Sequence, residues 1–175
     1  MNILEDDQLK LRAPEPSDLD LLYIWENDTS LWDKSATITP FSKHILEKYI
    51  QTAHLDLFEA QQLRLMIDHK TENRTIGTID LFEYDQFNNR AGVGILIANI
   101  SDRNKGYATL ALKLVINYSF TILGLKQLYC NIDVENSSSL KLFQSCGFEI
   151  VGTKKAWTRR GNKWLDDYFL QIINI

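Results

Sequence analysis

Apolar residues alternate with polar ones in some stretches of the chain and recur at helical spacing in others. Alternation is typical of half-buried strands, and apolar residues at i, i+3, i+4 and i+7 are typical of amphipathic helices. We expect strands at residues 9–12, 62–68, 75–84, 90–98, 127–133, 148–158 and 163–173. We expect helices from about residue 17 to residue 26, and at residues 42–60, 106–123 and 136–145.

Polar residues and glycines mark where the predicted helices begin and end. Ser17 and Ser42 are the predicted N-caps of the first two helices, because a serine hydroxyl can accept a hydrogen bond from the open first turn. Gly124 follows the third helix, at the position where glycine commonly ends a helix. Residues 27–40, between the first two helices, are predicted to be irregular.

The predicted order is β-α-α-β-β-β-α-β-α-β-β, with about seven strands and about four helices. This order indicates an α/β (α+β) protein with a mixed central sheet and a strand-loop-helix crossover in its middle. The chain has 175 residues, a length that a single domain can bury around one core. We therefore expect one domain over residues 1–175, without an internal repeat or a linker.

Composition and charge exclude several functional classes. The net charge is -4, and lysine and arginine are spread along the chain, so we expect no nucleic-acid-binding face. No apolar run approaches the length of a membrane span, and the first residues do not resemble a signal peptide, so we expect a cytoplasmic protein that binds no membrane. Two separated cysteines, Cys130 and Cys146, predict free thiols, and three scattered histidines predict no metal site.

The stretch "ILIANISDRNKGYATLALKLVINYSF", residues 95–120, runs from a predicted strand through a polar loop into a helix. A helix N-terminus offers unpaired N–H groups and a favourable dipole to an anion. Gly106 would let a phosphate approach the main chain, Ala108 keeps the next turn small, and Arg103 and Lys105 add positive charge. An ordinary strand-to-helix turn that contains a glycine is the alternative interpretation.

This loop, with the pattern R-x-x-G-x-A, resembles the pyrophosphate-binding motif of the GNAT superfamily of N-acetyltransferases. Downstream, "VENSSSLKLFQSCGF" at residues 134–148 resembles the second signature of that superfamily. The matching positions are Asn136, Ser139, Leu142, Gly147 and Phe148. Residues 9–12 and 161–166 resemble the ribosomal-protein-alanine and diamine (spermidine) acetyltransferase branches.

The resemblance implies that acetyl-CoA is the cosubstrate, and no metal is expected beside it. Its pyrophosphate would lie on the backbone of one continuous loop: Arg103, Asn104, Lys105, Gly106, Tyr107, Ala108 and Thr109. The pantetheine arm would run beside Leu96, Ile97 and Ala98, where the family's central sheet splays open. Asn136 would hold the pantetheine or acetyl end, with Ser139 close by, although an Asn at a helix start is ordinarily only a cap.

One position departs from the family pattern. The usual general acid is a tyrosine four residues before the Gly-Phe pair, and this chain has Phe143 there, which still counts among the implied cofactor contacts. A thiol leaving group has a pKa of about 8.5, so expelling it as a thiolate near pH 7.5 costs roughly 1.4 kcal/mol. The substitution would therefore slow the reaction without abolishing it. Ser139 is the predicted replacement donor, and a capping or packing role is its alternative.

The acceptor amine must lose a proton before it attacks, so the resemblance also implies a general base near the split in the sheet. Asp80 and Glu83 on one strand, and Tyr129 and Asp133 on another, are the candidates. Alternation predicts that Asp80 and Glu83 point to opposite faces, so that at most one points inward. Asp80 is carried forward with Asn136 and Ser139 as a catalytic candidate, and a solvated surface carboxylate is the alternative for either acid.

The acceptor should be bound by residues 26–40 and by the final hairpin near residues 157–164. Three tryptophans could line its groove, although core packing is the default expectation: Trp25, Trp32 and Trp157. The diamine branch has a glutamate where this chain has Gly92, which weakens a polyamine acceptor unless nearby acids compensate. The compensating candidates are Glu26, Asp28 and Asp33.

The predicted function is acetyl-CoA-dependent N-acetyl transfer to a primary amine by direct attack in a ternary complex. The acceptor would be a peptide or protein N-terminus, a polyamine or another small amine. A catalytically weak or inactive CoA-binding module is the alternative, and Phe143 is the feature that favours it. A homodimer through an exposed apolar edge at residues 168–173 is a further expectation, with coverage of that edge by its own domain as the alternative.

Overall fold

The computed structural model describes residues 2–35, 37–53 and 57–175. Its strands are β1 (Leu9–Arg12), β2 (Leu63–His69), β3 (Arg74–Asp85), β4 (Arg90–Ile97), β5 (Gln127–Asp133), β6 (Glu149–Arg160) and β7 (Lys163–Ile173). Its α-helices are α1 (Leu19–Glu26), α2 (Thr29–Ser35), α3 (Lys43–Thr52), α4 (Leu57–Ala60), α5 (Tyr107–Thr121) and α6 (Ser137–Ser145). Two 3₁₀ turns, η1 (Pro16–Asp18) and η2 (Ile100–Asp102), precede α1 and the loop before α5.

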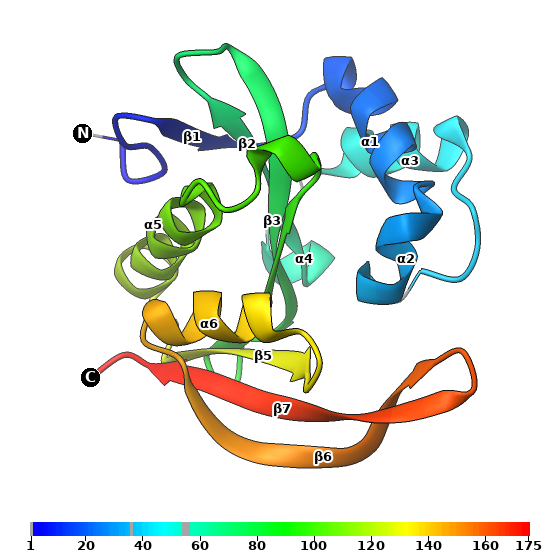
Figure 1. Cartoon of the computed structure of the whole chain (residues 1–175). Helices are drawn as coiled ribbons and strands as arrows, with labels where there is room; N and C mark the ends of the chain where they lie inside the picture. The colour runs from blue at the N-terminus through cyan, green and yellow to red at the C-terminus, as the bar shows by residue number, and fades with distance from the viewer. Residues whose placement is uncertain (1, 36, 54–56) are drawn as a thin grey trace.

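One seven-stranded sheet, in the order β1-β2-β3-β4-β5-β7-β6, forms the centre of the molecule (Figure 1). Every pair of neighbouring strands is antiparallel except β4 and β5, which are parallel. The helix α5 makes the crossover between these two strands, as a parallel connection requires. The mixed sheet and the central crossover confirm the predicted fold class.

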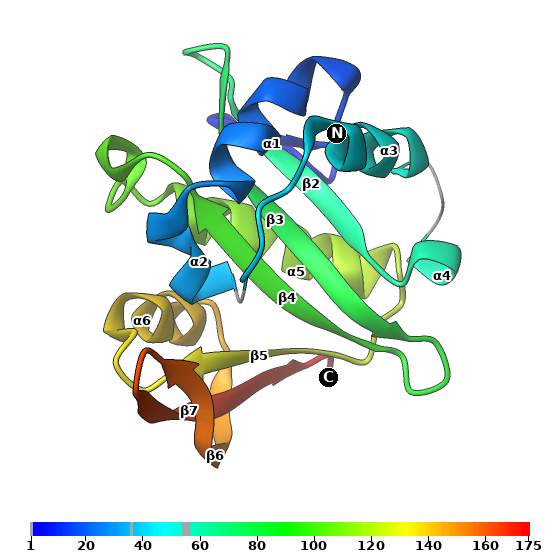
Figure 2. The ribbon, with the colours of Figure 1, turned by 90° about the vertical axis from the view of Figure 1, so that its right-hand side faces the viewer.

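The parallel pair stays together over only three residues of each strand. Residues 90–92 of β4 pair with residues 127–129 of β5. Beyond them, residues 93–97 remain bonded to β3 alone, and residues 130–133 remain bonded to β7. We call the place where the two strands part the split, and Figure 2 shows β4 and β5 diverging from it. The split leaves one edge of β4 open along half of its length.

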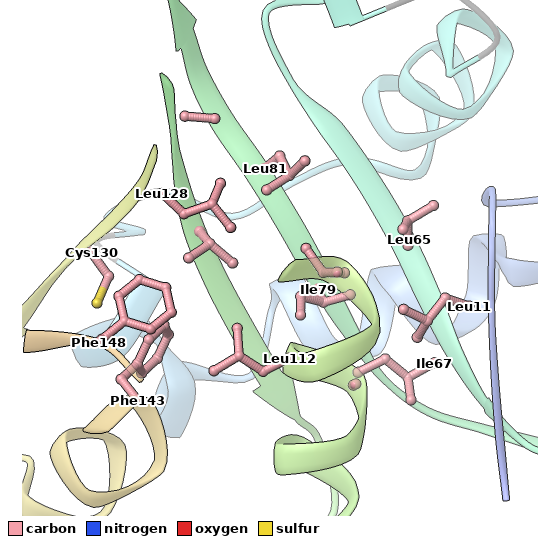
Figure 3. Close-up of a cluster of buried hydrophobic side chains, with 14 of the residues drawn as sticks. Leu11, Leu65, Ile67, Ile79, Leu81, Leu112, Leu128, Cys130, Phe143 and Phe148 are labelled. Atoms are coloured by element: carbon pink, nitrogen blue, oxygen red, sulfur yellow. The ribbon is translucent and has the colours of Figure 1, made fainter. Parts of the chain in front are cut away.

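The two faces of the sheet are covered by different helices. Ala111, Leu112 and Val115 of α5 are buried against one face, in a core shared with α6 (Figure 3). Leu22 of α1 and Leu46 of α3 bury against the other face, in a smaller core. We call this second face the α1/α3 face. On it lie those side chains of β2 to β5 that alternate away from α5.

Four predictions about elements need correction. Residues 27–40 contain the helix α2, although they were expected to be irregular. The predicted helix 42–60 is two helices, α3 and α4, and residues 54–56 lie outside the described residues. Ser17 lies inside η1, and Glu15 and Asp18 form a capping box in its place, whereas Ser42 does cap α3.

The fourth correction concerns the apolar edge. Strand β7 is bonded on one side to β5 and on the other to β6, so residues 168–173 are not an edge of the sheet. The outer strand on that side is β6, whose residues are mostly exposed. The alternative interpretation, coverage of residues 168–173 by the chain itself, is therefore confirmed.

Candidate active site

The loop before α5 has the geometry of an anion site. Gly106 is the N-cap of α5 and has φ = 85°, in the left-handed region that glycine adopts without strain. Apart from the adjoining backbone, no atom of the described residues lies within 4 Å of the place where a Cβ at Gly106 would stand, so the backbone there is open to a ligand. The Leu110 N–H donates to the Gly106 carbonyl. The amides of Tyr107, Ala108 and Thr109 precede this bond and have no partner within the helix.

An ion pair holds this loop against the sheet. Both carboxylate oxygens of Asp102, which is 1% exposed, accept from the Arg74 guanidinium at 2.7 and 2.6 Å. The hydrogen bonds from Arg74 keep the pKa of Asp102 below its ordinary value. On the other side, His69 Nδ1 accepts from the Glu72 N–H, so its Nε2 carries the proton and donates to the Tyr107 hydroxyl at 3.0 Å. Arg74 of β3 thus fixes η2 before the loop, and His69 of β2 fixes the first residue of α5 after it.

Arg103 plays a different part from the one its charge suggested. Its Nε donates to the Ile97 carbonyl and its Nη2 to the Ala98 carbonyl, each at 3.0 Å. The guanidinium therefore satisfies the carbonyls at the end of β4 with its Nε and Nη2, and only its remaining N–H groups could reach a phosphate. Lys105 is exposed, so it is the better-placed cation for that task.

The open edge of β4 leads from this loop toward the split. Leu96 and Ile97 belong to β4 and pair with Thr78 and Gly77 of β3. On the opposite edge, residues 93–97 pair with none of the strands that the structure describes, which is the arrangement that an extended pantetheine arm would need. Ala98 follows directly, and its N–H donates to the Ile76 carbonyl at 3.0 Å.

Asn136 and Ser139 meet at the start of α6. The Asn136 Oδ1 accepts from the Ser139 N–H at 3.2 Å and from the Ser138 hydroxyl at 3.1 Å, so the side chain is an N-cap. Within the described chain, neither the Asn136 Nδ2 nor the Ser139 Oγ makes a hydrogen bond. Capping thus leaves the two Asn136 Nδ2–H groups and the Ser139 hydroxyl available to a ligand, and the predicted cofactor role and the capping role are compatible.

Phe143 is part of the core. Its ring is 4% exposed and packs edge to face on Phe148, with 5.0 Å between the ring centroids (Figure 3). A side chain so enclosed offers almost no surface to a cofactor. The placement therefore does not support Phe143 as a cofactor contact, and that assignment stays a sequence-based prediction.

Asp80 is locked in a network on the α1/α3 face. Arg64 donates from Nε and Nη2 to its two oxygens at 2.7 and 3.1 Å, and also donates to Glu26. Burial raises the pKa of Asp80, against the opposing charge of Arg64. Burial tends to lower the pKa of Arg64, but Asp80 and Glu26 together raise it. Tyr49 lies below the guanidinium, and burial raises the pKa of its hydroxyl to about 12.

A row of aromatic rings crosses the sheet at the split. The Phe82 ring lies over Gly92, where a Cβ would come within 2.3 Å of it. Phe82 packs against Tyr129 with centroids 6.4 Å apart, and Tyr129 against Phe169 with centroids 5.6 Å apart. Phe82, Tyr129 and Phe169 therefore form a continuous row from β3 to β7, which we call the aromatic row. It covers the place where the diamine branch would carry a glutamate.

An ammonium group already rests on the end of the aromatic row. Lys154 Nζ is 5.2 Å from the centroid of Phe169 and 4.6 Å from that of Trp157, both within cation–π range. Trp157 is 59% exposed, whereas Trp25 is buried in the smaller core and Trp32 donates to the Glu26 carbonyl. Of the three predicted groove tryptophans, only Trp157 has such an exposed ring.

The remaining acidic and thiol candidates are placed as follows. Asp133 at the end of β5 is paired with Arg160 at 2.7 Å. Asp28 is exposed and accepts from the Ser30 N–H, and the side chain of Asp33 lies outside what the structure describes. Cys130 is buried, and burial raises the pKa of its thiol to about 12, which disfavours a nucleophilic thiolate. Burial also raises the pKa of Cys146.

Sequence reasoning missed the aromatic row and the anchoring pair Arg74–Asp102. The sequence shows at Gly92 only that the glutamate of the diamine branch is absent. Nothing in the local pattern indicates that Phe82 fills that space. An acid one residue before the R-x-x-G-x-A pattern was the one available signal for Asp102. Its partner is 28 residues away on β3, so the pair depends on the tertiary fold.

The open N-terminus of α5, the split beside β4 and the cap at α6 together form the frame of an acetyl-CoA site. A family model described as an acetyltransferase (GNAT) domain matches residues 8–149. The chain belongs to this family. It is an acyltransferase that uses acetyl-CoA to acetylate an amine, and the amides at the start of α5 fit the anionic pyrophosphate of that cosubstrate.

Relatives resemble the chain over most of its length. The uncharacterized N-acetyltransferase p20 of Bacillus licheniformis is 29% identical over 99% of this chain and 97% of its own. A spermidine N(1)-acetyltransferase of Vibrio cholerae serotype O1 is 27% identical over 82% of this chain and 80% of its own. The crystal structure of spermidine N-acetyltransferase from Vibrio cholerae with CoA and spermine has a TM-score of 0.85 at 25% identity, covering 96% of both chains.

The comparisons give the non-catalytic alternative no support.

Within the described residues, no helix is long and apolar enough to cross a membrane. Among the same residues, no group of three or more histidine, cysteine or acidic side chains is placed to hold a metal ion.

Proposed function

We propose that the acceptor is a small polyamine, acetylated by direct attack of one primary amine on the thioester in a ternary complex. The observation that carries the acceptor class is the aromatic row, which already holds an ammonium, that of Lys154, at its end. Aromatic faces attract alkylammonium groups, and a polyamine carries several. The relatives named spermidine acetyltransferases support the same class.

Direct attack is supported by the lack of an activated nucleophile among the described residues. Both thiols have a raised pKa, so neither favours the thiolate that an acetyl-enzyme would need. Asn136 Nδ2 and Ser139 Oγ are the donors that we propose for the acetyl or pantetheine end.

Three further expectations stay predictions: a single domain over residues 1–175, a cytoplasmic location and a homodimer. A relative of known structure from Vibrio cholerae is dodecameric.

A peptide N-terminus is the second candidate acceptor. The specific observation is that Phe82 fills the space above Gly92, which makes the site apolar where the diamine branch carries a carboxylate. An α-amine, with a pKa of about 7.7–8.0, also needs less help to become neutral than an alkylamine at about 10.4.

A thiol-release assay with a panel of amines tests both candidates. The panel holds spermidine, spermine, N-terminal peptides, amino acids and aminoglycosides, and calorimetry measures acetyl-CoA binding in parallel. Release that depends on polyamines alone confirms the proposal, and release with peptides alone moves the assignment to the second candidate. Acetyl-CoA binding without release from any amine would contradict both.

A further inference from the structure

The second acid on β3, Glu83, is turned onto the α1/α3 face by a break in the strand. The pairing of β3 with β4 shifts register between Phe82 and Asp85, and Glu83 has φ = 49°. Strict alternation would place Glu83 on the face opposite to Phe82. The bulge re-aims it instead, since its carboxylate reaches the hydroxyl of Tyr129, whose ring packs against Phe82.

The contact between the two side chains is short and specific. Tyr129 Oη donates to Glu83 Oε2 at 2.6 Å, the distance of a hydrogen bond to a charged acceptor. Burial is the larger cause that raises the pKa of Tyr129, and the hydrogen bond to Glu83 is the second. The phenol therefore keeps its proton at neutral pH. Glu83 is exposed, and the ion pairs found in the described part of the chain do not include it.

The charged groups around this pair leave Glu83 as its proton acceptor. Arg90 on β4 and Asp85 on β3 also act on Tyr129, but they pair with each other at 3.0 Å. Strand β7 contributes the neutral side chains Phe169 and Gln171. Within the described residues, no ion pair therefore joins a cation to the carboxylate that accepts the phenol's hydrogen bond.

The position of Tyr129 in the sheet places the pair beside the reaction. Tyr129 and Gly92 are the last paired residues before the split. From Gly92 to Ile97, β4 spans about 17 Å at roughly 3.3 Å per residue. An extended pantetheine arm is of this order, so an arm that starts at the α5 loop brings its thioester close to the level of Gly92.

We propose that Tyr129 and Glu83 together accept the proton of the acceptor ammonium, with Tyr129 touching the substrate and Glu83 acting through Tyr129. This assignment rests on the proposed transfer to an amine. In the step, the ammonium gives a proton to Tyr129 Oη while Tyr129 gives its own to Glu83. The freed nitrogen pair forms the C–N bond, the C–S bond breaks with its electrons on sulfur, and the second nitrogen proton passes to sulfur or water. Glu83 returns its proton to solvent.

The test compares kcat/KM against pH for the wild type, Tyr129→Phe and Glu83→Gln, with Glu149→Gln as the matched control on the exposed strand β6. Near pH 7 we expect both variants to lose about 10²-fold, the low end of general-base catalysis, because solvent can replace the pair. The loss should shrink toward the pKa of the amine, about 10.4, where neutral amine is abundant. The same loss at every pH, or none, would overturn the proposal.

A second readout needs neither cosubstrate nor turnover. In the wild type, the ¹³Cζ resonance of Tyr129 should move as acid protonates Glu83, and this movement should be missing from Glu83→Gln. A Tyr129 resonance that ignores acid in the wild type would contradict the pairing. If the wild type itself releases no thiol with any amine, the proposed function fails. If the wild type is active and the variants lose the same factor at every pH, only the assignment of Tyr129 and Glu83 fails.

Discussion

Asp80 and Glu83 stand three residues apart on β3, and the fold puts them in opposite situations. Asp80 is held by two hydrogen bonds from a half-buried arginine that also binds Glu26. Glu83 is exposed, and a neutral phenol is the partner that the structure gives it. A carboxylate clamped by an arginine is a structural element, whereas one held by a phenol can exchange a proton. The difference teaches that the partner, more than the type of residue, decides which acid can act as a base.

The largest expected effect comes from unlocking Asp80. Arg64→Met leaves Asp80 and Glu26 without their cation in a half-buried site, and we expect a loss of about 3 kcal/mol, the low end of the range for a buried pair. Urea denaturation should show this loss in the free energy of unfolding. The matched control is Arg90→Met, which removes an exposed pair worth about 0–1 kcal/mol. Equal losses in the two variants would contradict the assignment of Asp80 to a structural network.

The next largest effect on the free energy of unfolding is expected at Gly92, beside the Phe82 ring that packs on Tyr129. Gly92→Ala would place a Cβ within 2.3 Å of the Phe82 ring and push that ring against Tyr129. Overpacking of this kind costs about 1–3 kcal/mol, and Phe82→Leu in the same chain should recover part of the loss. Gly152→Ala is the control, because nothing lies within 4 Å of that added Cβ. Purely additive losses in the double variant would show that ring and glycine are not coupled.

A smaller effect should leave both acids untouched and weaken cosubstrate binding. Alanine at φ = 85° in Gly106→Ala costs about 1–2 kcal/mol of backbone strain and adds a methyl group to the loop that we propose to bind the pyrophosphate. Gly124→Ala carries the same kind of strain at φ = 65° on the far end of α5. Calorimetry should show weaker acetyl-CoA binding for the first variant only. Equal acetyl-CoA binding by the two variants would contradict the proposal that the loop before α5 binds the cosubstrate.

The smallest expected effect is on the rate of Phe143→Tyr. Its hydroxyl would enter a core beside Phe148, away from any exposed surface of the ring. We expect no increase in kcat in the thiol-release assay. A clear gain would mean that the ring reaches the leaving sulfur, as the family pattern implied, and that the core reading of Phe143 is wrong.

Local patterns predicted the elements well because periodicity is a local property. Strands β1, β5 and β7 lie where the sequence placed them, and α5 begins at the residue after Gly106. Helix α2 was missed because its seven residues are polar enough to resemble a loop. The geometry of the loop before α5 was also predictable, since it depends on one glycine and the helix start that follows.

The base could not be read in the same way, because its identity depends on partners far apart in the sequence. Arg64 is 16 residues from Asp80, and Tyr129 is 46 residues from Glu83. Alternation assigned the two acids to opposite faces, and the bulge at Glu83 breaks that rule. A positive φ at a glutamate leaves no trace in the pattern of apolar residues. Only the structure distinguishes Asp80, which Arg64 holds, from Glu83, which accepts from the Tyr129 hydroxyl.

The most direct test of this account measures kcat for Asp80→Asn and Glu83→Gln side by side, with saturating acetyl-CoA and amine at pH 7. Loss of the base predicts a decrease of about 10²-fold for Glu83→Gln, while Asp80→Asn should stay within about tenfold of the wild type and lose mainly stability. The reverse order, with Asp80→Asn nearly inactive and Glu83→Gln unimpaired, would contradict the assignment and return Asp80 to the role of base.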